Sequence, residues 1–182
     1  MKKWVGLLLT AALASCSGES NTTPANQLAH NDFEQIDGWL GDASTASLTK
    51  EKAHSGVYSV SVRPGQDYSL GYSNVLGKMS ASRPEKIKLN GWVFVPSAQA
   101  GAKLVVEVTD PTRPTDNTLL WQGIELNKKA KKFNEWQEIE EIIPLPATAK
   151  ATSRFKLYLW RADSAQPVYL DDIALNLDND AK

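Results

Sequence analysis

From about Asn31 onward the chain consists of short apolar runs, rich in Val, Ile, Leu, Tyr and Trp, separated by Gly, Pro, Asn, Asp and Ser. In the clearest runs apolar and polar residues alternate with a period of two; at 154–160, for example, the apolar face holds Phe155, Leu157 and Leu159. No segment repeats apolar residues at helical spacing over more than two turns. A period of two is typical of half-buried strands, so the sequence predicts an all-β domain.

About ten strands are expected from these runs. They lie near residues 31–34, 47–50, 57–62, 68–76, 87–95, 102–109, 118–126, 136–145, 154–160 and 168–177. Many short strands spaced by turn residues favour a two-sheet antiparallel β-sandwich of the jelly-roll kind. A closed barrel is the structural alternative. No internal repeat is visible, and a single domain is expected over residues 29–178.

The N-terminus has the order of a secretory signal. Lys2 and Lys3 precede an apolar run from Trp4 to Leu13, and the small residues Ala14 and Ser15 follow. This order predicts a signal peptide over residues 1–15. The run is too short for a transmembrane helix, which needs about 20 apolar residues.

Cys16 directly follows the expected cleavage site. The sequence Leu13-Ala14-Ser15-Cys16 resembles the lipobox of bacterial lipoproteins. The resemblance implies that Cys16 is lipidated and becomes the new N-terminus. The alternative is an ordinary secreted protein whose signal happens to contain a cysteine.

Residues 16–28 are polar and are expected to form a lipidated flexible tether, with a short tail at 179–182. Membrane contact is then expected through lipid alone, at the bacterial cell envelope. Ser17 after the cysteine suits sorting to the outer membrane in some Gram-negative bacteria.

Composition excludes several classes of protein. Because Cys16 is the single cysteine, an intrachain disulfide, a thiolate metal cluster and a Cys-His catalytic pair are all excluded. Without Lys2 and Lys3, 18 basic and 21 acidic residues remain, a net charge of −3. Such a weak acidic balance gives no electrostatic basis for binding nucleic acid.

Nothing in the sequence predicts an active site. The two histidines, His30 and His54, fit no metal-ligand spacing and are expected to be ordinary turn residues. The carboxylates at 138–141 are interpreted as the solvated face of a strand, although glycosidic chemistry also uses paired carboxylates. A non-enzyme is therefore predicted, with a polysaccharide lyase or hydrolase as the least favoured alternative.

Five motifs occur in a particular order along the domain. They are Asn31-Asp32-Phe33-Glu34, Ala53-His54-Ser55-Gly56-Val57-Tyr58-Ser59-Val60, Leu89-Asn90-Gly91-Trp92-Val93, Glu135-Trp136-Gln137 and Val168-Tyr169-Leu170-Asp171-Asp172-Ile173-Ala174-Leu175. The set resembles the galactose-binding-like jelly rolls that serve as carbohydrate-binding modules of bacterial cellulases and xylanases. The resemblance covers Asn31 to Leu177 and is more specific for the fold than for the ligand.

Asp171 and Asp172 stand in an apolar strand. By strand periodicity Asp171 shares a face with Tyr169, Ile173 and Leu175, so one acid is expected to point inward. A buried carboxylate is costly unless it is compensated, and Ca²⁺ prefers oxygen ligands.

The resemblance implies such a structural calcium, joining the first and last strands. Glu34 and one of the two aspartates, preferably Asp171, would be its side-chain ligands, and backbone carbonyls of residues 52–55 would add others. The alternative is that Asp171 and Asp172 both lie in water at a strand end.

Alternation also sorts the aromatic residues. It places Tyr158 and Trp160 on the face of the 154–160 strand that is opposite the apolar face. Trp121 and Glu107 likewise lie opposite the apolar faces of the 118–126 and 102–109 strands. If these faces belong to one sheet, they form an aromatic surface with charged partners. The expected hydrogen-bond partners at its rim are Arg161, Gln122 and Asn90, and the tryptophans expected in the packing are Trp39 and Trp136.

These residues predict non-catalytic binding of a polysaccharide or oligosaccharide by a lipid-anchored envelope protein. Trp and Tyr also fill sandwich cores, so burial of the same rings with no ligand involved remains open. The alternative function is an envelope interaction or structural lipoprotein whose sandwich face binds another protein, since aromatic residues are also enriched at protein interfaces.

Overall fold

The computed structural model describes residues 24–36, 38–39 and 45–178. The predicted signal peptide, Cys16, the first part of the tether and the tail lie outside these residues. The described part contains ten β-strands, two one-turn helices, α1 (Leu76–Met79) and α2 (Leu126–Lys129), and the 3-10 turn η1 (Thr45–Ser47). The predicted number of strands is confirmed.

The larger sheet has six strands, and all its pairings are antiparallel. Five of them follow the order β2-β3-β10-β5-β8, and β1 pairs with β10 as well. Their bounds are β1 (Gln27–Asn31), β2 (Leu48–Thr49), β3 (Ser59–Val62), β5 (Lys86–Phe94), β8 (Trp136–Pro144) and β10 (Val168–Leu177).

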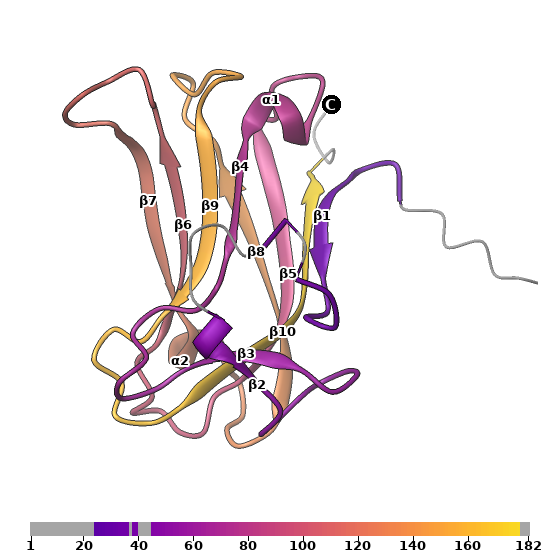
Figure 1. Ribbon diagram of the computed structural model, residues 1–182, viewed down its shortest axis with the longest axis vertical. Helices are drawn as coiled ribbons and strands as arrows, with labels where there is room; N and C mark the ends of the chain where they lie inside the picture. Colours follow the sequence, from indigo (N-terminus) through magenta and orange to yellow (C-terminus); the bar gives the residue numbers. More distant parts are fainter. Residues whose placement is uncertain (1–23, 37, 40–44, 179–182) are drawn as a thin grey trace, which may run out of the picture.

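The smaller sheet has four antiparallel strands in the order β4-β9-β6-β7. They are β4 (Tyr72–Val75), β6 (Lys103–Thr109), β7 (Thr118–Glu125) and β9 (Arg154–Trp160). Figure 1 shows the four strands of this sheet beside the strands of the larger one. Strand β7 is an edge of the smaller sheet and β8 an edge of the larger one. The all-β, two-sheet architecture that the alternation predicts is confirmed.

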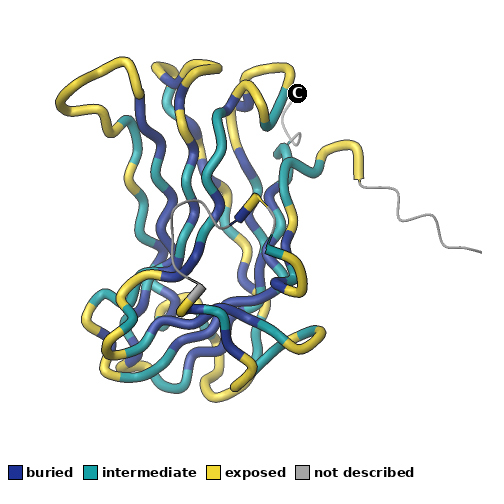
Figure 2. Tube along the Cα trace, viewed as in Figure 1, coloured by how far each residue is buried: buried dark blue, intermediate teal, exposed yellow. Residues whose placement is uncertain are grey.

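The core lies between the two sheets, where every second residue of the long strands points inward. Ile87, Leu89 and Val93 of β5 are completely buried, as are Phe155 and Leu159 of β9. Figure 2 shows the buried segments along the strands and the exposed ones mainly in the loops. Because the described chain has no disulfide, the burial of this apolar surface is the main stabilising contribution to the fold.

The first strand differs from the prediction. Strand β1 takes in Gln27 and Leu28, which the sequence analysis leaves in the tether, and it ends at Asn31, where the predicted strand begins. The segment pairs with β10, with Gln27 opposite Asn176. Most of its residues are only partly buried and do not alternate strongly between apolar and polar, so this strand has little local signal in the sequence.

Strand β10 contains an irregularity that reverses the predicted face of Asp171. The register with β5 shifts between Asp171 and Ala174, and Asp172 has φ 45°. Between these pairs β10 has one residue more than β5, as in a β-bulge, so the side chains after it point to the opposite face from that expected. Ile173 and Leu175 therefore face the core, whereas Asp171 and Tyr169 lie on the outer face; the prediction that all four share one face is wrong.

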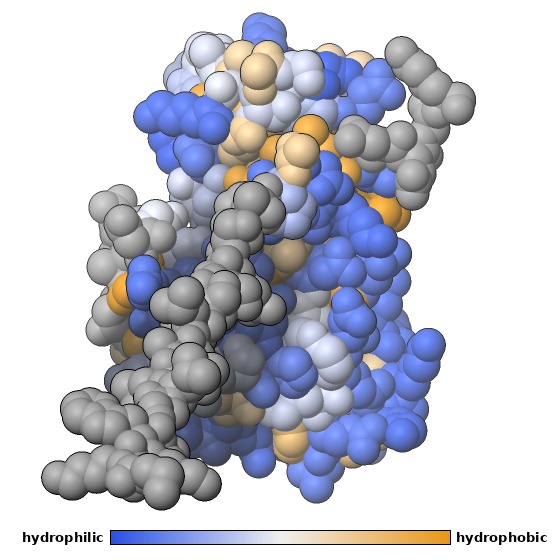
Figure 3. All heavy atoms as spheres, turned by 90° about the vertical axis from the view of Figure 1, so that its right-hand side faces the viewer, coloured by the Kyte–Doolittle hydropathy of each residue, from blue (hydrophilic) through white to orange (hydrophobic). Residues whose placement is uncertain are grey.

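The side of the molecule that carries β1 shows mostly hydrophilic residues, with hydrophobic ones in small groups (Figure 3). No helix among the described residues is both long and apolar enough to cross a membrane.

Candidate functional site

The outer face of the four-stranded sheet carries the residues predicted to bind a ligand. Strand β9 turns Tyr158 and Trp160 to this face because Leu157 and Leu159 point into the core. Trp121 of β7 lies directly opposite Glu107 of β6, so both belong to the same face. The structure thus brings all four predicted residues together.

Four aromatic rings on this face form a row in which each ring contacts the next. We call these residues, Tyr158, Tyr68, Trp160 and Trp121, the aromatic platform. The ring of Tyr68 is nearly parallel to that of Trp160, with centroids 6.4 Å apart and 12° between the planes. Trp121 meets Trp160 edge-on at 6.3 Å, and Tyr158 meets Tyr68 at 5.9 Å. Tyr68 is 54% exposed and Trp121 49%, so these rings are not part of the core.

Tyr68 was not among the residues predicted to bind a ligand. Simple alternation places Tyr68 on the same face as Leu70 and Tyr72, which are both buried. The segment before β4 has one residue more than the stretch of β9 that it pairs with. Ser69 is hydrogen-bonded to Leu159, whereas Tyr72, three residues later, lies opposite Leu157, only two residues away from Leu159. This extra residue reverses the face, and Tyr68 instead lies opposite Trp160 on the outside.

Charged groups border the rings. The Glu107 carboxylate lies 3.7 Å from the Lys156 ammonium, and Lys156 is the residue opposite Glu107 on β9. Burial raises the pKa of the Tyr158 phenol, and the negative charge of Glu107 raises it further. The phenol therefore stays protonated at neutral pH and can both donate and accept hydrogen bonds.

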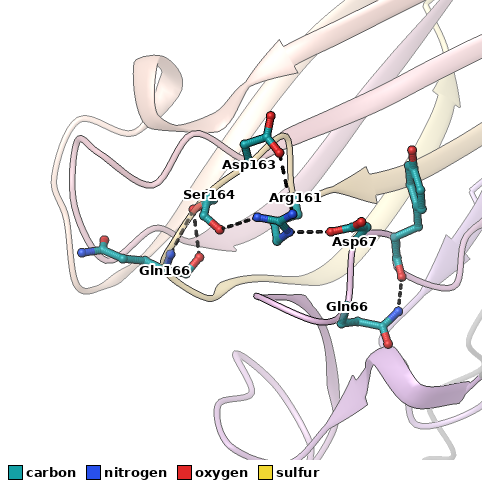
Figure 4. Close-up of polar contacts among 7 residues, drawn as sticks. Gln66, Asp67, Arg161, Asp163, Ser164 and Gln166 are labelled. Carbon is teal, nitrogen blue, oxygen red and sulfur yellow. Dashed lines mark hydrogen bonds and ion pairs between the residues drawn. The ribbon is translucent and has the colours of Figure 1, made fainter.

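Two loops hold the Tyr68 end of the platform, and Arg161 connects them (Figure 4). Its guanidinium donates to the Asp67 carboxylate and to the Ser164 carbonyl, and it lies 3.7 Å from Asp163. Gln66 donates to the carbonyl of Tyr68 in the same region. Arg161 was predicted as a rim partner for a ligand, but its donors are used to fasten the loops beside Trp160.

The other predicted rim residues do not border the platform. Gln122 lies opposite Val106, a core residue, and so points to the inner face of the sheet. Asn90 belongs to β5 of the other sheet, where it donates to Glu140. Trp39 is buried in the core as expected, while Trp136 is partly exposed and packs edge-on against Phe94.

On the six-stranded sheet, Asp171 is completely buried under the loop 52–58. One of its carboxylate oxygens accepts the backbone N–H groups of His54 (2.7 Å) and Ser55 (3.3 Å), and the other accepts that of Asp172. Burial raises the pKa of Asp171 to about 6, although these hydrogen bonds oppose the rise.

Glu34 and Asp172 hold the same loop from its other sides. Glu34 accepts the backbone N–H groups of Val57 and Tyr58, both at 2.7 Å, and Asp172 accepts the Ser55 hydroxyl. The carboxylates predicted as calcium ligands are thus engaged by N–H and O–H donors. Within the described ranges, no group of three His, Cys, Asp or Glu is arranged to hold a metal ion, and the calcium stays a prediction.

His54 has a packing role that the sequence analysis did not anticipate. Its ring stacks on Trp92, with centroids 3.7 Å apart, and its Nδ1 pairs with the Asp172 carboxylate. Ser55 bonds the same carboxylate and not the imidazole. This arrangement fixes the loop on the sheet and differs from the Ser-to-His hydrogen bond that a nucleophilic serine requires.

Comparison with solved structures finds the same fold in carbohydrate-binding modules of family 22. A xylan-binding domain of that family superposes with a TM-score of 0.54 at 15% identity, covering 88% of this chain and 100% of the other. The C-terminal family 22 module of Clostridium thermocellum Xyn10B gives the same values. The first xylan-binding module of Paenibacillus barcinonensis Xyn10C gives 0.51 at 17% identity, covering 88% and 100%.

No protein-family model matches the sequence, and no curated protein matches it. The similarity to the solved structures confirms the sandwich fold that the motifs predict. These neighbours are described as xylan-binding domains.

Proposed function

We propose that this protein binds a polysaccharide or oligosaccharide, without catalysis, on the aromatic platform. The observation that carries the proposal is the row of four contacting rings on the outer face of one sheet, two of them about half exposed. Sugar rings present apolar C–H faces that stack on Trp and Tyr, while their hydroxyl groups require polar partners. The Tyr158 hydroxyl and the Glu107–Lys156 pair supply such partners next to the rings.

The ligand class follows from the shape of the surface. The platform is an open row of contacting rings, one pair stacked and two pairs edge-on, which suits several consecutive units of a chain better than one enclosed monosaccharide. Structures with this fold are described as xylan-binding. We therefore take a β-1,4-linked xylan chain as the first ligand to test.

The same proposal includes the lipid anchor at Cys16. A domain attached to the outer membrane by its N-terminal lipid would hold a captured glycan at the cell surface. Attachment by acyl chains requires no apolar patch on the domain itself.

The test is calorimetric titration of the mature chain with xylohexaose, comparing wild type with Trp121→Ala. Trp121 is 49% exposed, so its truncation removes stacking area with little effect on the core. We expect the affinity to fall at least tenfold, about 1.4 kcal/mol. Phe133→Ala is the matched control, because Phe133 is also an exposed aromatic residue, at 39%, but lies outside the platform.

Unchanged affinity in Trp121→Ala would contradict the proposal. So would the failure of folded wild type to bind any sugar across a broad panel. The second result would favour the alternative in which the same exposed rings bind another protein, since aromatic residues are enriched at interfaces.

A further inference from the structure

A pocket of about 370 Å³ lies along the edge strand β7. Its walls are the consecutive β7 residues 122–125, Lys128 and Lys129 of α2, and Glu141 of β8. It therefore opens where the edge strands of the two sheets meet. Its volume falls within the ~300–1,000 Å³ range of small-molecule sites.

The pocket begins where the aromatic platform ends. Gly123 forms part of its wall, and the Trp121 ring lies close enough that a Cβ on Gly123 would come within 2.8 Å of it. Lys103 bridges the two regions, because its Nζ is 5.9 Å from the centre of the Trp160 ring and 3.8 Å from Glu125 in the pocket. A ligand stacked on Trp121 can thus continue into the pocket.

The polar residues of the pocket occupy positions that would normally be apolar. Gln122 lies opposite Val106 and Glu141 opposite Leu89, so both belong to the inner faces of their sheets. The Gln122 side-chain amide donates a hydrogen bond to the Glu141 carboxylate across the sandwich, with 3.4 Å between nitrogen and oxygen. Lys129 forms an ion pair with the same carboxylate. Apolar residues here would close the sandwich at a lower desolvation cost, so stability alone does not account for these side chains.

The chemistry of the pocket matches hydroxyl groups. Glu125 and Glu141 accept hydrogen bonds, Lys128 and Lys129 donate them, and Gln122 does both. Each of the two lysines is already paired with one of the carboxylates, which lowers the attraction for an anion. A sugar hydroxyl, which donates and accepts at once, fits this mixed and nearly neutral set.

We infer that this pocket is a side-branch subsite. A glycan whose main chain stacks on the platform places a neutral glycosyl branch over the β7 edge, where the pocket binds it. The protein then prefers branched chains to linear ones. This inference rests on the proposed function and adds the class of glycan that the same face selects.

The test compares linear xylohexaose with xylohexaose bearing single arabinofuranosyl branches, by calorimetric titration of the mature chain. We expect at least tenfold tighter binding of the branched compound. In Glu141→Gln and in Gln122→Ala the preference should fall below threefold, with the affinity for linear xylohexaose unchanged within twofold. Glu140→Gln is the matched control, because Glu140 is the next residue but lies on the outer face of β8 and pairs with Lys88; it should keep the preference.

Equal affinity of wild type for the two compounds would overturn the inference and leave the proposed function intact. A preference that survives in both pocket variants would also overturn it. Xylohexaose bearing a charged glucuronosyl branch is titrated as a third compound, and a preference for that compound alone would contradict the neutral branch. If neither the linear nor the branched compound binds, the inference is overturned, and titration with the broad sugar panel then decides whether the proposed function also fails.

Discussion

Gly123 allows the platform to form, because its missing side chain leaves room for an indole ring. A Cβ at this position would meet the Trp121 ring at 2.8 Å and the Lys103 stem at 3.1 Å. Trp121 and Gly123 lie two residues apart on the same face of β7, so any larger side chain at 123 competes with the ring for the same surface.

We expect Gly123→Val to weaken xylohexaose binding about as strongly as Trp121→Ala. The valine would displace the tip of the ring, while its β-branched side chain suits a strand, so the melting temperature should change little. Calorimetric titration and a thermal melt measure the two effects.

Gly101→Ala is the matched control, because a Cβ there meets only the Ala162 carbonyl, at 4.0 Å. Normal binding in Gly123→Val would show that the position of the Trp121 ring does not matter for the ligand.

The loop 52–58 is docked on the larger sheet by carboxylates from two other elements. Along one side of β10, strand β3 pairs with residues up to Leu170 and β1 with residues from Ile173 onward. Asp171 and Asp172 lie between these two pairings, and the backbone N–H groups of His54 and Ser55 take the place of a neighbouring strand there. Because no strand pairs with β10 at this point, the loop can approach and donate hydrogen bonds to the buried Asp171 carboxylate.

The predicted calcium belongs to this loop. We expect Ca²⁺ to raise the melting temperature of wild type by several degrees, since a ligand at 100 times its Kd contributes about 2.7 kcal/mol. Glu34→Gln keeps an oxygen for the Val57 and Tyr58 N–H groups but loses the charge, so it should respond less. Thermal melts with added Ca²⁺, Mg²⁺ or chelator measure the response.

Asp32→Asn serves as the control, because Asp32 accepts a local hydrogen bond from the Glu34 backbone N–H, and the hydrogen bonds of the described residues do not join it to the loop 52–58. A wild-type melting temperature that is the same in Ca²⁺ and in chelator would mean that hydrogen bonds alone hold the loop.

Regular alternation was enough to predict the outer faces of β6, β7 and β9, and with them Trp121, Tyr158, Trp160 and Glu107. It failed wherever a strand gains one residue, because a one-residue shift moves every following side chain to the other face. That is why Asp171 was expected on the same face as Ile173, and why alternation gave no sign that Tyr68 lies on the outer face. Such irregularities depend on partners far along the chain, as between Ser69 and Leu159.

Side-chain contacts between elements far apart in the chain could not be predicted from the sequence either. The Arg161 contacts with the 66–68 segment and the Gln122–Glu141 contact join residues whose proximity depends on how the strands are ordered in the sheets. The sequence supplied the residue types but not these partners.

The whole molecule combines a sandwich that presents the platform with an N-terminal segment predicted to be lipidated. The aromatic side chains lie on strands rather than on loops, with the exception of Tyr68, so the sheet holds their spacing. A rigid surface loses little conformational entropy on binding. The proposed role at the cell envelope depends on both parts.

We expect wild type to fractionate with membranes and to incorporate a labelled fatty acid in a bacterial host. Cys16→Ser should abolish the labelling and release the protein from the membrane fraction, because Cys16 is the single cysteine of the chain. Ser17→Ala, a neighbouring change that keeps the cysteine, should remain labelled. Labelling of Cys16→Ser, or its absence in wild type, would contradict the anchor.

The most direct measurement is an NMR titration that follows the indole N–H signals of the mature chain as xylohexaose is added. We expect the signals of Trp121 and Trp160 to shift progressively, while that of Trp39, buried in the core, stays in place. Shifts confined to Trp92 and Trp136 on the other sheet, or no shift at any tryptophan, would contradict a glycan site on the aromatic platform.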